Sequence, residues 1–85
     1  MRPGDIVHTE HYEAPPTGAP YAINVIVKRS GGYAVETRQL DGPGYGWFTR
    51  TDPDHGYKTI KGAVNGGQRT ARAMEDQTYR EGFDN

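Results

Sequence analysis

The sequence predicts a small α+β domain in which an antiparallel sheet of three to four strands is packed by one C-terminal helix. The chain has 85 residues, which is the size of a single domain. Short segments with an apolar period of two, separated by glycine and proline, fill the chain up to Thr51. A helical period begins at Thr59. Because an amphipathic helix must bury its apolar side, we expect it to cover one face of the sheet.

The N-terminal residues predict a strand followed by a linker. A Pro-Gly turn leads into an apparent strand over about residues 5–11. Residues 14–20 read APPTGAP, and three prolines disfavour a strand in the centre of a sheet. We therefore expect an N-terminal strand and a proline-rich linker at 1–20, a single domain at 21–80 and a frayed tail at 81–85.

A β-hairpin is the clearest feature of the middle of the chain. Ile23, Val25 and Val27 recur with period two, and Ile26 places an apolar side chain on the other face. A Ser-Gly-Gly segment follows, and glycine accepts the positive φ that tight hairpin turns require. An aromatic and β-branched segment then predicts a third strand. The strands expected in this part of the chain span residues 21–29, 33–40 and 45–51.

One helix, at about residues 59–80, is expected to follow the strands. Thr59 suits the N-cap position, because its hydroxyl can accept a hydrogen bond from an early helical N–H. Two glycines after Asn65 are each about 1 kcal/mol less favourable than alanine, so two shorter helices, at 59–65 and 68–80, are an open alternative. The apolar stripe of the single helix consists of Ile60, Ala63, Val64, Gly67, Ala71, Met74 and Thr78.

Three glycines inside this helical period need an explanation. Gly67 lies in the apolar stripe, where a missing side chain would let the helix approach the sheet, near Trp47. Gly62 and Gly66 lie off the stripe, and we expect them to point outward or to admit a second chain. The segment does not match a phosphate-binding loop, because the glycines lie inside a helical period and Gln68 follows them.

The composition limits the classes of function. Hydrophobic residues make up 33% of the chain and glycines number 12, so a partner or a homodimer could supply apolar burial that one copy lacks. The absence of cysteine excludes disulfides and thiolate metal sites. No apolar run reaches the roughly 18 residues of a membrane span, and we expect a cytoplasmic protein. The net charge of −1 gives no overall attraction to nucleic acid.

A short motif resembles a known family. The motif G-Y-x-[ST]-x3-A-x-N-G is formed by Gly56, Tyr57, Thr59, Ala63, Asn65 and Gly66. It resembles the end of the small YegP-like domain, a family of unknown function, and the likeness covers residues 23–74. The chain departs from the family at Ile60, where lysine is usual, and at Gly67, where a branched aliphatic residue is usual. The resemblance implies three strands before a helix and a tendency to pair, with no catalytic residues. The order of elements is also similar to that of arm-binding domains of phage integrases.

Candidate chemistry is sparse. His8, Glu10 and His11 are metal-ligand types, but on a strand His8 and Glu10 share one face and His11 lies on the other. His55 could join them only from a distant turn. Ser30 is the only serine and lies in the predicted hairpin turn. We therefore expect no metal, no cofactor and no enzymatic activity.

Protein binding is the function that the sequence favours. Tyrosine and tryptophan are enriched at interfaces because they are large, rigid and amphipathic. A sheet with one helix has a second face that another molecule could cover. The sequence thus favours a non-enzymatic interaction module that is homodimeric and binds another protein, such as a phage or mobile-element accessory protein that inhibits a host factor. The candidate protein-binding residues are Tyr33, Tyr45, Trp47 and Phe48.

Nucleic-acid binding is the alternative. Basic residues are expected along the outer side of the helix and on the open side of the sheet, where aromatic rings could stack on bases. The neutral total charge and the acidic residues after Met74 disfavour strong binding. The candidate residues are Lys28, Arg38, Arg50, Lys58, Lys61, Arg69 and Arg72.

Overall fold

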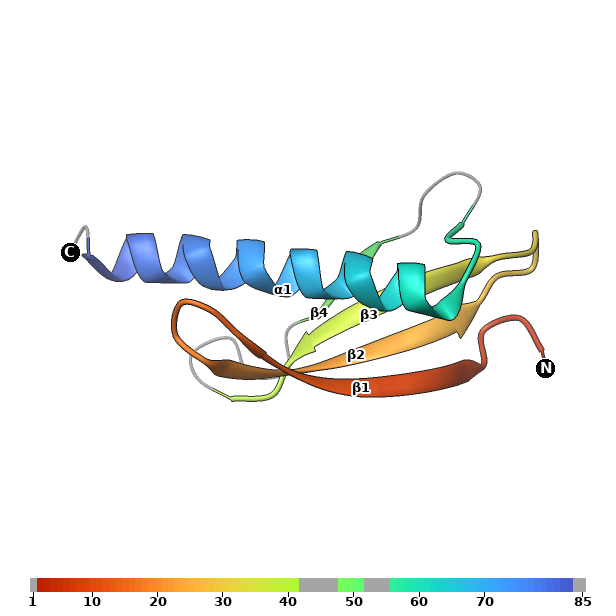
Figure 1. Cartoon of the computed structure of the whole chain (residues 1–85), viewed down its shortest axis with the longest axis horizontal. Coiled ribbons are helices and arrows are strands. Elements are labelled where there is room, and N and C mark those ends of the chain that lie inside the picture. The colour runs from red at the N-terminus through yellow and green to blue at the C-terminus, as the bar shows by residue number, and fades with distance from the viewer. Residues whose placement is uncertain (1, 42–47, 52–55, 84–85) are drawn as a thin grey trace.

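The fold is a four-stranded antiparallel sheet with one helix across it. The computed structural model describes residues 2–41, 48–51 and 56–83, and their side chains except at 48, 49, 51 and 78–83. Within these residues the sheet order is β1-β2-β3-β4, and α1 crosses one face of the sheet (Figure 1). The predicted α+β class is confirmed. The elements are β1 (Ile6–Ala14), β2 (Ala19–Val27), β3 (Tyr33–Gln39), β4 (Phe48–Thr51) and α1 (Ile60–Phe83).

The prediction of a proline-rich linker is wrong, because β1 and β2 form a hairpin. Their register runs from Ile6 opposite Ile26 to Ala14 opposite Ala19, with an irregularity between Ile6 and His8. Only a short turn separates the two strands, so residues 6–14 belong to the sheet. Pro20 lies inside β2, but its backbone oxygen accepts from Leu40, just beyond β3. The N–H that Pro20 lacks would point to the end of the β2–β3 ladder, where proline is tolerated.

The hairpin of β2 and β3 is confirmed, with Val25 opposite Val35 and Ile23 opposite Thr37. Its turn contains Gly31, whose φ of 94° is the positive value expected of a tight turn. The fourth strand pairs with β3 over Phe48–Thr51. The rest of the strand predicted at 45–51 lies outside the described residues.

Helix α1 is continuous, so the alternative of two shorter helices is wrong. It begins at Ile60, and the N–H of Gly62 donates to the Thr59 hydroxyl at 2.9 Å, which confirms the predicted N-cap. It runs through Phe83, beyond the end expected at about residue 80, and the last two residues of the predicted frayed tail lie outside the described residues. The C-terminal turns extend beyond the loop that joins β1 and β2 (Figure 1).

Two adjacent glycines let α1 lie close to the rest of the fold. A Cβ on Gly67 would lie 2.6 Å from Ile23 Cγ2 and 2.9 Å from Val35 Cγ2. The predicted close approach at Gly67 is confirmed, whereas its expected neighbour, Trp47, lies outside the described residues. Gly66 does not point outward as expected, because it is buried under the ring of Tyr57, whose Cζ would be 2.6 Å from an added Cβ.

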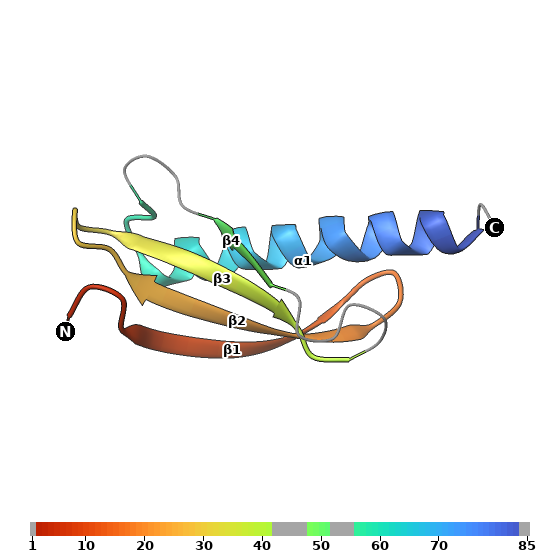
Figure 2. The ribbon, with the colours of Figure 1, turned by 180° about the vertical axis from the view of Figure 1, so that it is seen from behind.

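The core lies between α1 and the sheet. Figure 2, seen from behind, also shows α1 along one side of the sheet only. Among the described residues, α1 has the length of a membrane span but not its apolar composition, and no helix meets both requirements. The main cluster consists of Ile23, Val25, Val35, Ala63 and Val64, and a second cluster of Ala14, Tyr21 and Ala71.

Candidate functional site

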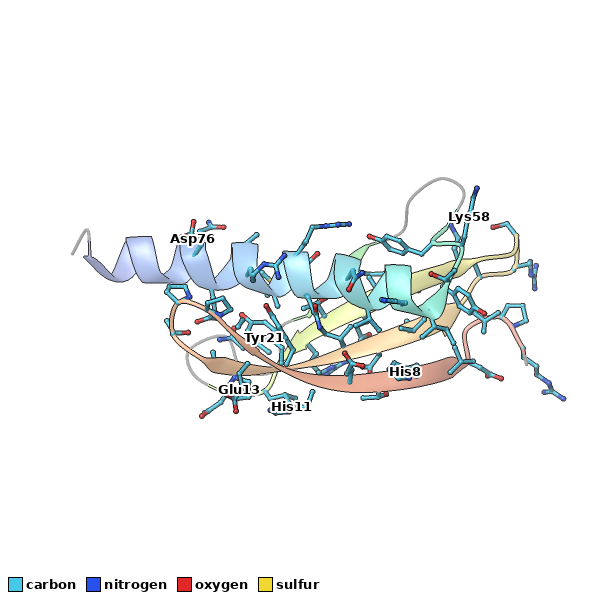
Figure 3. All side chains as sticks on the ribbon, viewed as in Figure 1. His8, His11, Glu13, Tyr21, Lys58 and Asp76 are labelled. Carbon is cyan, nitrogen blue, oxygen red and sulfur yellow. The ribbon has the colours of Figure 1, made fainter. Side chains whose placement is uncertain are left out.

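One face of the sheet is not covered by any described helix or strand, and we call it the open face. Residues directly opposite in an antiparallel register share a face. Because the core residue Val25 faces α1, its neighbours Asn24 and Ile26 face the other way. His11 and Glu13 lie on this open side, away from α1, whereas Tyr21 lies between the sheet and α1 (Figure 3). The register then places Ala22, opposite His11, near the middle of the open face.

A hydrogen-bonded row of side chains crosses the open face over three strands. The Thr9 hydroxyl of β1 donates to Asn24 Oδ1 of β2 at 2.9 Å, and Asn24 Nδ2 donates to Glu36 Oε1 of β3 at 3.2 Å. Arg38 Nε donates to the same Glu36 oxygen at 3.3 Å. These contacts fix the side chains before any partner arrives, which lowers the entropy cost of binding.

The outer edge of β1 has backbone groups that the sheet does not use. The carbonyl of Ala14 accepts from Gly18 within the β1–β2 turn, so Ala14 directs its backbone groups toward β2. In an antiparallel ladder such residues alternate with residues whose N–H and C=O point away. Pro20, opposite Glu13, has no N–H to donate, which agrees with this alternation. The outward-directed residues are Thr9, His11 and Glu13, all with exposed side chains.

A groove of about 350 Å³ lies between β1 and the N-terminal half of α1. At its β1 side, His8 Nε2 lies 3.2 Å from Glu10 Oε1. These two side chains share the face toward α1, as the sequence predicts, and His11 lies on the opposite face. Among the described residues no group of three potential metal ligands occurs. The lining residues are His8, Glu10, Ile60, Lys61, Val64, Asn65 and Gln68.

A buried carboxyl group fastens the C-terminal half of α1 to the sheet. Glu75 is 2% exposed. It accepts hydrogen bonds from the hydroxyls of Tyr21, at 2.5 Å, and of Thr17, and from Gln39 Nε2 at 3.4 Å. Burial raises the pKa of Tyr21 well above its usual value, and the hydrogen bond to Glu75 and the charge of Glu75 act in the same direction. Because the Glu75 carboxyl and Tyr21 are buried and bonded to each other, we interpret this cluster as a structural contact rather than a reactive site.

Of the four predicted protein-binding residues, only Tyr33 has a described side chain. Tyr33 is half-buried and packs against the core below α1. The backbone of Phe48 pairs with Arg38 at the β4 edge. Tyr45 and Trp47 lie outside the described residues. The binding role of these four residues therefore stays a prediction.

The predicted basic residues fall into separate groups. Lys28 and Arg50 line one depression of about 440 Å³ near the N-terminal turn. Arg38 bonds to Glu36 on the open face, and Arg72 Nη1 donates to the Tyr12 hydroxyl at 3.3 Å. Among the described side chains, the basic residues that α1 and the segment before it expose are Lys58, Lys61, Arg69 and Arg72.

Three important residues are not singled out by the sequence, although a signal existed for each. Asn24 and Glu36 occupy open-face positions of strands whose alternate residues are apolar, so period two could have indicated their pairing. Glu75 lies four residues after Ala71, which continues the apolar stripe of α1. A charged residue at that position is a sign of a buried, hydrogen-bonded carboxyl.

Compared with models of protein families, with curated proteins and with solved structures, the chain shows no match in any of the three sets. The resemblance to the YegP-like family therefore stays a prediction.

Proposed function

We propose that this protein is a non-enzymatic interaction module that binds another protein through the uncovered part of its sheet. The observation that carries the proposal is the hydrogen-bonded row from Thr9 to Arg38 on the open face. The row presents both acceptors and donors, and its side chains are already ordered. Polar groups of this kind supply the hydrogen bonds of a typical protein interface.

The surroundings of the row support the same role. Ala22 lies next to the row, and Ile6, on the open face opposite Ile26, is 56% exposed. Apolar positions near ordered polar groups are typical of binding surfaces. The buried titratable groups Tyr21 and Glu75 bond to each other and hold α1 in place, which favours a binding role over a catalytic one.

A nucleic-acid role has weaker support from the same surfaces. Arg38 is paired with the carboxylate of Glu36, and the guanidinium of Arg72 is directed to the hydroxyl of Tyr12. A mobility shift at low salt that is lost in Arg69→Ala/Arg72→Ala would support this alternative instead.

The experiment compares two variants that carry the same chemical change at different places. Ala22→Arg puts a bulky cation near the middle of the open face, and Ala73→Arg puts one on the exposed side of α1. We expect the chain to capture a protein from a lysate of its own cells, and the purified protein to bind the wild type and Ala73→Arg. Binding to Ala22→Arg should be at least about tenfold weaker, a loss of about 1.4 kcal/mol.

Equal binding by Ala22→Arg and Ala73→Arg would show that the open face is not the binding surface. A chain that captures no protein and stays monomeric at every concentration would contradict the proposed function as a whole. Circular dichroism of both variants checks that each one folds.

A further inference from the structure

The outer edge of β1 indicates how the protein binds a partner strand. Strand β1 has nine residues and lies at one end of the sheet order, and in the described part of the chain no strand pairs with its outer side. Strand β4, at the opposite edge, has four residues in the part of the chain that the structure describes. A long edge strand with free N–H and C=O groups is a template for pairing with another strand.

The positions of the free backbone groups select one register for a second copy of the chain. Thr9, His11 and Glu13 direct their groups outward, and His11 is the centre of this set. An antiparallel second copy related by a two-fold axis at His11 pairs Thr9 with Glu13 and His11 with its own equivalent. All three residues then form hydrogen-bonded pairs. A register shifted by one pair toward the turn leaves Thr9 opposite Pro15, which has no N–H. A shift in the other direction puts Glu13 opposite Val7, in the irregular part of β1.

The charges on the side facing α1 favour the same register. It places Glu10 of one copy directly opposite Tyr12 of the other, in the closer type of antiparallel pair. Tyr12 accepts a hydrogen bond from Arg72, so the Glu10 carboxylate of one copy meets the Arg72 guanidinium of the other. Glu10 is available for this contact, because its side chain is 44% exposed. With the axis at Glu10 instead, two Glu10 carboxylates would face each other.

We propose that the protein forms a homodimer by antiparallel pairing of two β1 strands about a two-fold axis at His11. The two sheets join into one continuous sheet, and the axis, perpendicular to it, places both copies of α1 on the same face. This inference rests on the proposed function and names a second copy as one partner. The open face of each copy stays accessible to a different protein.

Cross-linking tests the register directly, because the chain has no cysteine. Under mild oxidation by oxidised glutathione, we expect His11→Cys to form a covalent dimer, since Cα atoms in a hydrogen-bonded pair lie within disulfide range. Thr9→Cys and Glu13→Cys should cross-link to each other when mixed, and neither should cross-link efficiently alone. Efficient self-cross-linking of Thr9→Cys, or none by His11→Cys, would overturn the register.

A charge exchange tests the contact between Glu10 and Arg72 without an oxidant. Sedimentation of Glu10→Arg should give a dimer dissociation constant at least about tenfold higher than that of the wild type. The double variant Glu10→Arg/Arg72→Glu should recover most of the loss. Lys58→Glu is the control, because it reverses an exposed charge outside β1 and should leave the dimer unchanged. Failure of the double variant to recover would overturn the contact.

The outcomes separate this inference from the proposed function. A monomeric chain that still captures a partner sensitive to Ala22→Arg would overturn the β1 dimer and leave the proposed function standing. A dimer that shows none of the predicted cross-links would mean that the chain self-associates through another surface, and it would overturn the proposed pairing of two β1 strands. Cross-links in the predicted pattern support the dimer, whatever the capture experiment returns.

Discussion

The two faces of the sheet use hydrogen bonds for different purposes. On the covered face, the buried carboxyl of Glu75 accepts from the hydroxyls of Thr17 and Tyr21, and Gly67 lies against Ile23. On the open face, a comparable number of polar side chains bond to each other at or near solvent. Buried polar groups are costly to leave unpaired, whereas exposed groups can exchange partners with water. The comparison indicates that the covered face maintains the fold and the open face is free to bind.

The largest effect on the covered face is expected from Gly67→Leu. Even a Cβ at this position would lie 2.6 Å from Ile23, so a larger side chain must push α1 off the sheet. We expect a loss of about 3 kcal/mol in the free energy of unfolding, with a melting temperature lower by roughly 10 °C or more. Ala73→Leu, on the exposed side of α1, is the control. An unchanged melting temperature would contradict the close packing at Gly67.

The next effect is expected at the buried carboxyl. Glu75→Ala removes the acceptor of the Tyr21 and Thr17 hydroxyls and leaves the buried hydroxyl of Tyr21 unpaired. We expect a loss of about 2 kcal/mol in urea unfolding. Asp76→Ala changes an exposed acid one position away and should cost no more than about 0.5 kcal/mol. Equal losses in the two variants would show that Glu75 is not a structural contact.

The raised pKa of Tyr21 predicts a pH dependence of the covered face. The unfolded chain releases the tyrosine proton near pH 10, and the folded chain retains it to higher pH. The contribution of this group is therefore complete below pH 10 and is lost as the pH rises further. Above pH 10, the ionisation of this tyrosine lowers the free energy of unfolding by up to about 1.4 kcal/mol per pH unit. Unfolding of the wild type and Tyr21→Phe between pH 9 and 12 measures it, and identical slopes would contradict the interpretation.

The smallest effect is expected on the open face. Asn24→Ala removes the centre of the row that joins Thr9 to Glu36, but water can replace both contacts. We expect a loss of about 0.5 kcal/mol or less in the free energy of unfolding. A loss as large as that of Glu75→Ala would show that the row maintains the fold and would weaken its role in binding.

Periodicity predicts most of the covered face from the sequence. The alternation of Ile23 and Val25 gives the central strand, and the helical stripe places Gly67 against it. Thr59 caps α1 as its position before the first helical turn indicates. These features depend on local pattern, which a single sequence contains.

The features that sequence analysis misses depend on contacts between distant residues. The β1–β2 hairpin is missed because a proline at position 20 disfavours a strand. Only the contact with Leu40 shows that Pro20 lies at the end of the β2–β3 ladder, where it is tolerated. Gly66 is misplaced because the ring that covers it belongs to Tyr57, before the helix. The continuity of α1 across both glycines comes from this tertiary packing, which outweighs their low helix propensity.

The candidate site is less predictable than the fold for the same reason. The sequence places Arg38 and Arg50 on the open side of the sheet, but their neighbour Glu36 depends on the strand register. The free edge of β1 can be recognised only when the order of strands in the sheet is known. A prediction that treats residues 14–20 as a linker does not give that order.

Amide hydrogen exchange at low and high protein concentration tests most directly whether the outer edge of β1 pairs with a second copy of the chain. The amides of Glu10 and Tyr12 point toward β2 and should be protected at both concentrations. The amides of Thr9, His11 and Glu13 point outward and should become protected only at high concentration, when a second β1 pairs with them. Fast exchange of these three amides at the highest concentration would contradict self-pairing of β1.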